Sequence, residues 1–151
     1  MMAPLLPRSL GAEYRGSQSA LWLFGLVVTV RSLQSLVSIF NGHYVAITAD
    51  GIPVDSYTAA GAQTVLALFA LIGVAKLPFH ALSVLALVRF RSAVPLFFAI
   101  MALEYIVRSL TLMYLPIERS GPAGGLVVNR VLFAVMLVGL WLSLRTRRDL
   151  T

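Results

Sequence analysis

The sequence contains no cysteine among its 151 residues. This absence excludes disulfides, thiolate metal sites, iron–sulfur clusters and redox-active dithiols. The patterns of common catalytic sites are missing as well, since there is no G-x-S-x-G, no H-E-x-x-H and no P-loop. The glycine-rich stretch "GPAGGL" at 121–126 lacks the lysine that a phosphate-binding loop requires. We therefore expect no cofactor and no enzymatic activity.

Charged residues are scarce, at 12% of the chain, while 59% of the residues are hydrophobic and the mean hydropathy is +0.88. A soluble domain usually carries about 25% charged residues, so this chain has too few polar side chains to cover a surface facing water. We predict an integral membrane protein without a separate soluble domain, because no polar stretch is long enough to fold alone. We expect no cleaved signal peptide, because the short apolar patch in residues 1–19 is interrupted by Pro4 and Pro7.

Four apolar segments are long enough to span a bilayer, which requires about 20 residues in a helix. They predict an all-α integral membrane protein, a four-helix transmembrane bundle with up-down-up-down topology. The transmembrane domain is expected at 20–145, after an N-terminal segment at 1–19 and before a basic tail at 146–151. Its helices are predicted at about 20–40, 62–89, 94–115 and 125–144.

The positions of arginine predict the orientation, because short loops rich in Lys and Arg stay in the cytoplasm. The side opposite the arginine-rich one carries Arg119 together with Asp50, Asp55 and Glu118. We predict a multi-pass protein of a bacterial-type inner (plasma) membrane with both termini cytoplasmic. This orientation accounts for the net charge of +6 and removes the need for nucleic acid as a partner. The arginines on the predicted cytoplasmic side are Arg8, Arg15, Arg89, Arg91, Arg145, Arg147 and Arg148.

Polar and charged side chains recur in the middle of the predicted helices. A charge at this depth costs about 2.5–3.5 kcal/mol, so such residues face the bundle interior or water. Within each helix their spacing places them on one face, because residues three, four and seven apart lie on the same side. We predict that they form one polar core, open or nearly open to the outer side, and that this core is a hypothetical binding site. Its members are Arg31, Gln34, Ser35, Ser38, Lys76, His80, Glu104 and Arg108.

The predicted core has an excess of positive charge. Together with Arg130 in the fourth helix, four cations face the single carboxylate of Glu104. Pairing of Glu104 with Arg108 or Arg31 leaves three positive charges over. Three explanations stay open: a deprotonated Lys76, an Arg130 side chain that reaches the outer interface, or a bound anion. The anion would be a lipid headgroup, an anionic amphiphile or a carboxylate of a partner protein.

These features lead to three functional hypotheses. The first is a non-enzymatic accessory or interaction subunit, or a protein that assembles with itself, whose polar core sets helix register. The alternative is a carrier or binding protein for an anionic amphiphile or lipid, with the charged cluster lining the site. The third is a membrane enzyme acting on a lipid or quinone, with His80 and Glu104 as acid and base. A purely structural network between the helices would explain the same residues.

The longest loop of the sequence contains three potential metal ligands, His43, Asp50 and Asp55. One histidine and two aspartates at this spacing match no established metal site. We therefore expect no bound metal ion there.

Overall fold

The computed structural model describes Tyr14 and residues 16–145, and this part of the chain is helical with no β-strand. Four long helices make up the fold, and with the turn before α4 each is long and apolar enough to cross a membrane. The predicted all-α class with four candidate spans is therefore confirmed. The helices are α1 (Gln18–Phe40), α3 (Ala59–Val88), α4 (Val94–Tyr114) and α5 (Gly124–Leu144).

The bounds of these helices differ from the predicted spans by three residues or fewer. The largest difference is at the start of α3, where the Thr58 side chain caps the helix by accepting a hydrogen bond from the Gly61 amide at 3.2 Å. Most of the predicted segment 1–19 and all of the tail 146–151 lie outside the described residues. The same holds for four of the arginines that predict the orientation: Arg8, Arg15, Arg147 and Arg148.

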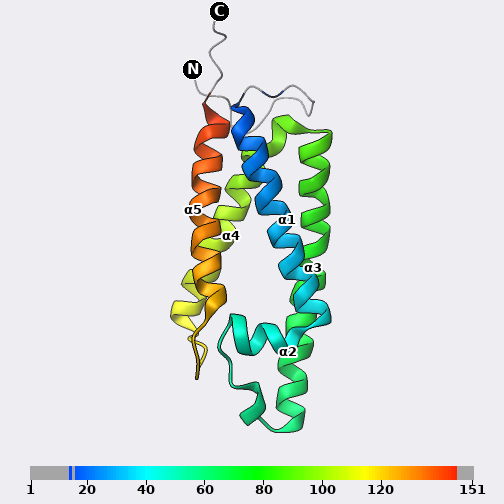
Figure 1. The fold of residues 1–151 in the computed structure, drawn as a ribbon, viewed down its shortest axis with the longest axis vertical. Helices are drawn as coiled ribbons and strands as arrows, with labels where there is room; N and C mark the ends of the chain where they lie inside the picture. The colour runs from blue at the N-terminus through cyan, green and yellow to red at the C-terminus, as the bar shows by residue number, and fades with distance from the viewer. Residues whose placement is uncertain (1–13, 15, 146–151) are drawn as a thin grey trace, which may run out of the picture.

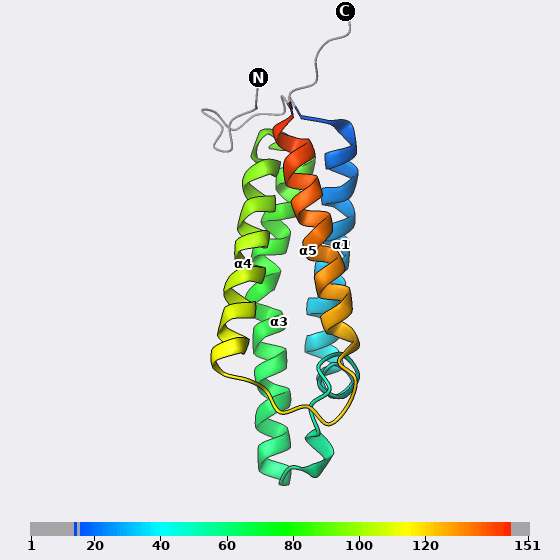
Figure 2. The same ribbon diagram turned by 90° about the vertical axis from the view of Figure 1, so that its left-hand side faces the viewer.

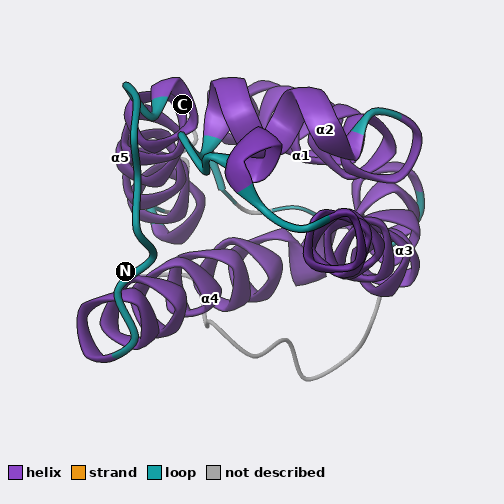
Figure 3. Cartoon of the chain, turned by 90° about the horizontal axis from the view of Figure 1, so that it is seen from below, coloured by secondary structure: helices purple, strands orange, loops and turns teal. Residues whose placement is uncertain are grey.

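Consecutive long helices run in opposite directions, as Figure 1 and Figure 2 show. We call the end where α1 begins and α5 ends the terminal end, and the opposite end the capped end. Seen along the bundle, α1 lies between α3 and α5, and α4 packs mainly against α5 (Figure 3). The helices α3 and α4 make few contacts, although only the short turn η3 (Arg91–Ala93) joins them. They diverge from this turn toward the capped end (Figure 1).

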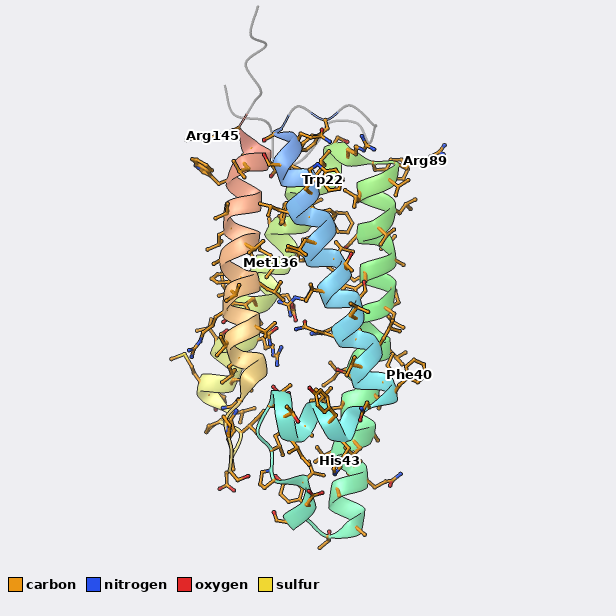
Figure 4. The ribbon with its side chains drawn as sticks, in the orientation of Figure 1. Trp22, Phe40, His43, Arg89, Met136 and Arg145 are labelled. Carbon is orange, nitrogen blue, oxygen red and sulfur yellow. The ribbon has the colours of Figure 1, made fainter. Side chains whose placement is uncertain are left out.

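An apolar core fills the half of the bundle near the terminal end. The rings of Phe24 and Phe98 meet edge to face with their centroids 5.0 Å apart. Gly139 leaves room for the Phe98 ring, because a Cβ atom there would overlap it. Met136 points from α5 into this core (Figure 4). The buried members are Leu21, Phe24, Val27, Val28, Val94, Phe98, Met101, Leu132 and Met136.

The segment between α1 and α3, residues 42–56, folds across the other end of the bundle, and we call it the cap. It contains the short helix α2 (Gly42–Tyr44), a π-helical turn η1 (Val45–Ala49) and a 3₁₀ turn η2 (Val54–Ser56). A small buried cluster of Ala46, Ile52 and Val54 holds the cap against the start of α3. The predicted long outer loop is therefore a packed element that covers one end of the bundle (Figure 1).

Gly51 allows the chain to turn back within the cap. Its φ of +69° lies in the left-handed region, which glycine adopts without the steric cost of a side chain. The Gly51 carbonyl accepts a hydrogen bond from the Ser120 amide at 3.0 Å. This bond attaches the cap to the loop between α4 and α5.

Candidate functional site

Arg31 is buried in the middle of α1, with 7% of the residue exposed. Its Nη1 donates a hydrogen bond of 3.2 Å to the Oδ1 atom of Asn129, which connects α1 to α5. Its Nη2 is buried and has no hydrogen-bond partner among the described residues. A buried donor without a partner loses its interaction with water and gains nothing in return. Arg31 is therefore a charged group with unused bonding capacity inside the bundle.

Lys76 and Glu104 form an ion pair between α3 and α4. The Nζ atom of Lys76 lies 3.0 Å from Oε1 of Glu104. Sequence reasoning considered Arg108 and Arg31 as possible partners of Glu104, whereas in the structure its ion-pair partner is Lys76 on a different helix. The exposed fractions of the two side chains are 34% and 42%, so the pair is only partly covered by the chain itself.

Asp50 joins the charged side chains from the cap. Its carboxylate is largely buried, and Oδ1 lies 3.9 Å from Nη2 of Arg108 on α4. Its main-chain carbonyl accepts a hydrogen bond of 3.0 Å from Nε of Arg119. Sequence reasoning placed Asp50 only in the outer loop and missed this role. The Asp50-Gly51 dipeptide indicates a turn, but nothing in the sequence shows that the turn brings the carboxylate against α4.

Five groups thus form a charged layer: Arg31, Asp50, Lys76, Glu104 and Arg108. Glu104 lies within electrostatic range of all three cations. The layer holds three cations and two carboxylates, so one positive charge is in excess, compared with the three predicted. Arg130 is exposed on α5 and does not belong to the buried set.

The other predicted residues of the polar core divide into two groups. His80 and Ser35 are both buried, and Nδ1 of His80 lies 3.4 Å from Oγ of Ser35. Gly73 allows this close approach of α1 and α3, since a Cβ atom there would lie 2.7 Å from the Ser35 carbonyl oxygen. Ser38, in contrast, donates to the main-chain carbonyl of Gln34 at 2.9 Å, which is a local contact within α1. Ser35 and His80 therefore border the layer, whereas Ser38 bonds within its own helix.

The potential metal ligands of the cap do not converge. His43 Nε2 lies 2.8 Å from Asp55 Oδ1 in an exposed pair, while the Asp50 carboxylate faces Arg108. Within the described part of the chain, no three His, Asp or Glu side chains are grouped to hold a metal ion. Figure 4 shows His43 in the cap, at the end of the bundle opposite Arg89 and Arg145.

Comparison with protein-family models, with curated proteins and with solved structures finds no significant match to the chain. The charged layer is therefore interpreted from its own geometry. Through the hydrogen bond of Arg31 to Asn129 on α5, it connects all four long helices, and it presents an ion pair and a half-buried guanidinium on the side of the bundle between α3 and α4. We call this the α3–α4 side.

Proposed function

We propose that the protein is a non-enzymatic interaction subunit of the inner membrane, which binds another membrane-embedded chain through its α3–α4 side. The observation that supports this proposal is the Lys76–Glu104 ion pair. It lies near the middle of two candidate spans, and its side chains are 34% and 42% exposed. Charges at this depth cost about 2.5–3.5 kcal/mol each when they face lipid. A second chain with polar groups at the same depth would remove that exposure.

The packing of the helices supports the same side. The helices α3 and α4 make few contacts with each other, whereas α1 packs closely on α3 and α5. Exposed apolar residues lie one turn before each member of the ion pair, Ile72 on α3 and Ile100 on α4. A polar centre with apolar surroundings is the composition expected where one membrane helix packs on another.

Cross-linking tests this interface, and the absence of native cysteine makes single-cysteine variants unambiguous. We expect Ile72→Cys and Ile100→Cys to cross-link in native membranes, because their side chains are 54% and 40% exposed on the proposed interface. Val138→Cys on α5, with an exposed fraction of 50%, is the matched control and should give little product. The mass of the product distinguishes a second copy of the chain from a different partner. Equal products at all three positions, or none at any, would exclude this interface.

The proposed orientation places the terminal end in the cytoplasm. Arg89 and Arg145 lie at the terminal end (Figure 4), and Asp50 and Asp55 belong to the cap by their position in the chain. This distribution agrees with the tendency of basic residues to stay in the cytoplasm. Exposed tyrosines at the capped end, among them Tyr44 and Tyr114, and exposed tryptophans at the terminal end fit the two interfaces of a bilayer.

Thiol labelling of intact cells tests the orientation. An impermeant maleimide should label Ser56→Cys in the exposed part of the cap before lysis. It should label Ser19→Cys, exposed at the start of α1, only after lysis. The reverse pattern would show that the capped end faces the cytoplasm.

A further inference from the structure

The charged layer contains two guanidinium groups, and the carboxylates near them do not neutralise both. Arg31 on α1 and Arg108 on α4 lie within electrostatic range of each other, and both lie within range of Glu104. The Glu104 carboxylate is hydrogen-bonded to Lys76 at 3.0 Å. Arg31 has a neutral partner, Asn129, at Nη1 and none among the described residues at Nη2. The layer therefore has both a surplus positive charge and an unused donor at one place.

We propose that the charged layer binds one anionic group, a phosphate or a carboxylate, held between Arg31 and Arg108. Guanidinium groups suit this ligand, because their planar set of donors matches the oxygens of either anion. Asn129 accepts a hydrogen bond from Nη1 of Arg31, which leaves Nη2 for the ligand. This binding would take place within the chain itself, so it does not depend on the proposed partner interface.

Asp50 acts in this arrangement as an internal counter-ion. Its distance of 3.9 Å from Arg108 is longer than a hydrogen bond, so the contact is purely electrostatic. The cap is attached through main-chain oxygens, with Arg119 bonded to the Asp50 carbonyl and Ser120 to the Gly51 carbonyl. The Asp50 side chain can therefore turn away from Arg108 without detaching the cap. An incoming anion competes with this carboxylate for Arg108.

The surroundings of the layer make it a binding site and not a passage. The apolar core around Phe24, Phe98 and Met136 fills the bundle between the layer and the terminal end. An ion would have to cross that core without polar groups to replace its water, which is strongly unfavourable. Arg108, with a side chain 35% exposed, lies at the accessible part of the layer, while Arg31 lies deeper. An anionic group would thus enter past Arg108 and stop at Arg31.

Calorimetry on the full chain in an uncharged maltoside detergent tests the site, with dodecyl phosphate as the probe. We expect the affinity to fall about tenfold or more in Arg31→Gln and in Arg108→Gln, because each change removes a charge-assisted hydrogen bond. Arg130→Gln is the matched control, since Arg130 is exposed on α5 next to Asn129, and it should bind like the unmodified chain. If Arg31→Gln fails to fold, the affinities of Arg108→Gln and Arg31→Lys are compared with that of the unmodified chain instead. Arg31→Lys should retain part of the affinity.

If Asp50 is the counter-ion of Arg108, its removal should change the affinity in the direction opposite to the arginine substitutions. Asp50→Asn should raise the affinity for dodecyl phosphate, because it removes the competing carboxylate without changing the size of the side chain. Asp55→Asn, in the same segment but paired with His43, should leave the affinity unchanged. An unchanged affinity in Asp50→Asn would exclude the competition between this carboxylate and the ligand.

A second probe identifies the source of the anion. Inorganic phosphate that binds with the same dependence on Arg31 and Arg108 would assign the site to a free anion. Binding of dodecyl phosphate alone would assign it to the headgroup of an amphiphile. Either result supports the site. No binding of either probe, or binding that both glutamine variants retain in full, would overturn it. Because this experiment uses the isolated chain and the cross-linking experiment uses native membranes, failure of one is distinguishable from failure of the other.

Discussion

Removal of the Lys76–Glu104 ion pair should weaken the link between α3 and α4 by a measurable amount. The two atoms are 3.0 Å apart, but the side chains are 34% and 42% exposed. Breaking a fully buried pair costs about 3–5 kcal/mol, and a surface pair contributes about 0–1 kcal/mol. For this partly exposed pair we expect Lys76→Met and Glu104→Gln each to lower the free energy of unfolding by roughly 1–2 kcal/mol.

A double-mutant cycle separates the pair from other effects of the two substitutions. The double variant should be destabilised by less than the sum of the single variants. We expect a coupling between about 0.6 kcal/mol, the average measured for polar contacts between membrane helices, and about 1.7 kcal/mol, the maximum. Unfolding by dodecyl sulfate in maltoside micelles, followed by far-ultraviolet circular dichroism, gives these free energies. A parallel cycle of Arg130→Met with Glu104→Gln is the control and should show no coupling. Zero coupling between Lys76 and Glu104 would refute the ion pair and remove the main support for the partner interface.

Three further substitutions test local features by the same unfolding measurement. Gly73→Ala should destabilise the chain by about 1–3 kcal/mol, because the new Cβ would lie 2.7 Å from the Ser35 carbonyl oxygen; an unchanged stability would mean that α1 and α3 are less closely packed. Gly51→Ala should cost about 1–2 kcal/mol, because the φ of +69° is unfavourable for a residue with a side chain, and no loss would argue against this turn. Tyr14→Phe should stabilise the chain by up to about 1 kcal/mol, since the buried Tyr14 hydroxyl has no hydrogen-bond partner in the described part of the chain; a loss of stability would reveal a missing partner.

The four long helices were predictable because the length of an apolar run relates directly to the thickness of a bilayer. The end of α1 at Phe40 and the start of α4 at Val94 agree with the predicted positions. The start of α3 was placed too late, because a weakly apolar first turn does not stand out from the preceding loop. Its Thr58 cap depends on one side-chain hydrogen bond, which hydropathy does not register.

The sequence indicated most of the residues of the charged layer, but not the contacts between them. Spacing along one helix shows that Lys76 and His80 share a face, and likewise Glu104 and Arg108. It does not show which other helix lies opposite that face. The partners of Glu104 and Arg108 could therefore not be identified from the sequence, because they come from α3 and from the cap. Such long-range neighbours depend on the angle between α3 and α4 and on the fold of the cap, neither of which is encoded in a local pattern.

The position of the layer between two packed regions limits how anything can reach it. The apolar core fills the terminal end, and the cap, whose residues Ala46, Ile52 and Val54 are buried, covers the opposite end. Of the charged side chains in the layer, the three on α3 and α4 are at least one-third exposed, whereas Arg31 and Asp50 are buried. Access from within the plane of the membrane, along the α3–α4 side, therefore requires the least rearrangement. A polar group that arrives by this route meets Arg108 first, and the buried Arg31 lies deeper in the layer.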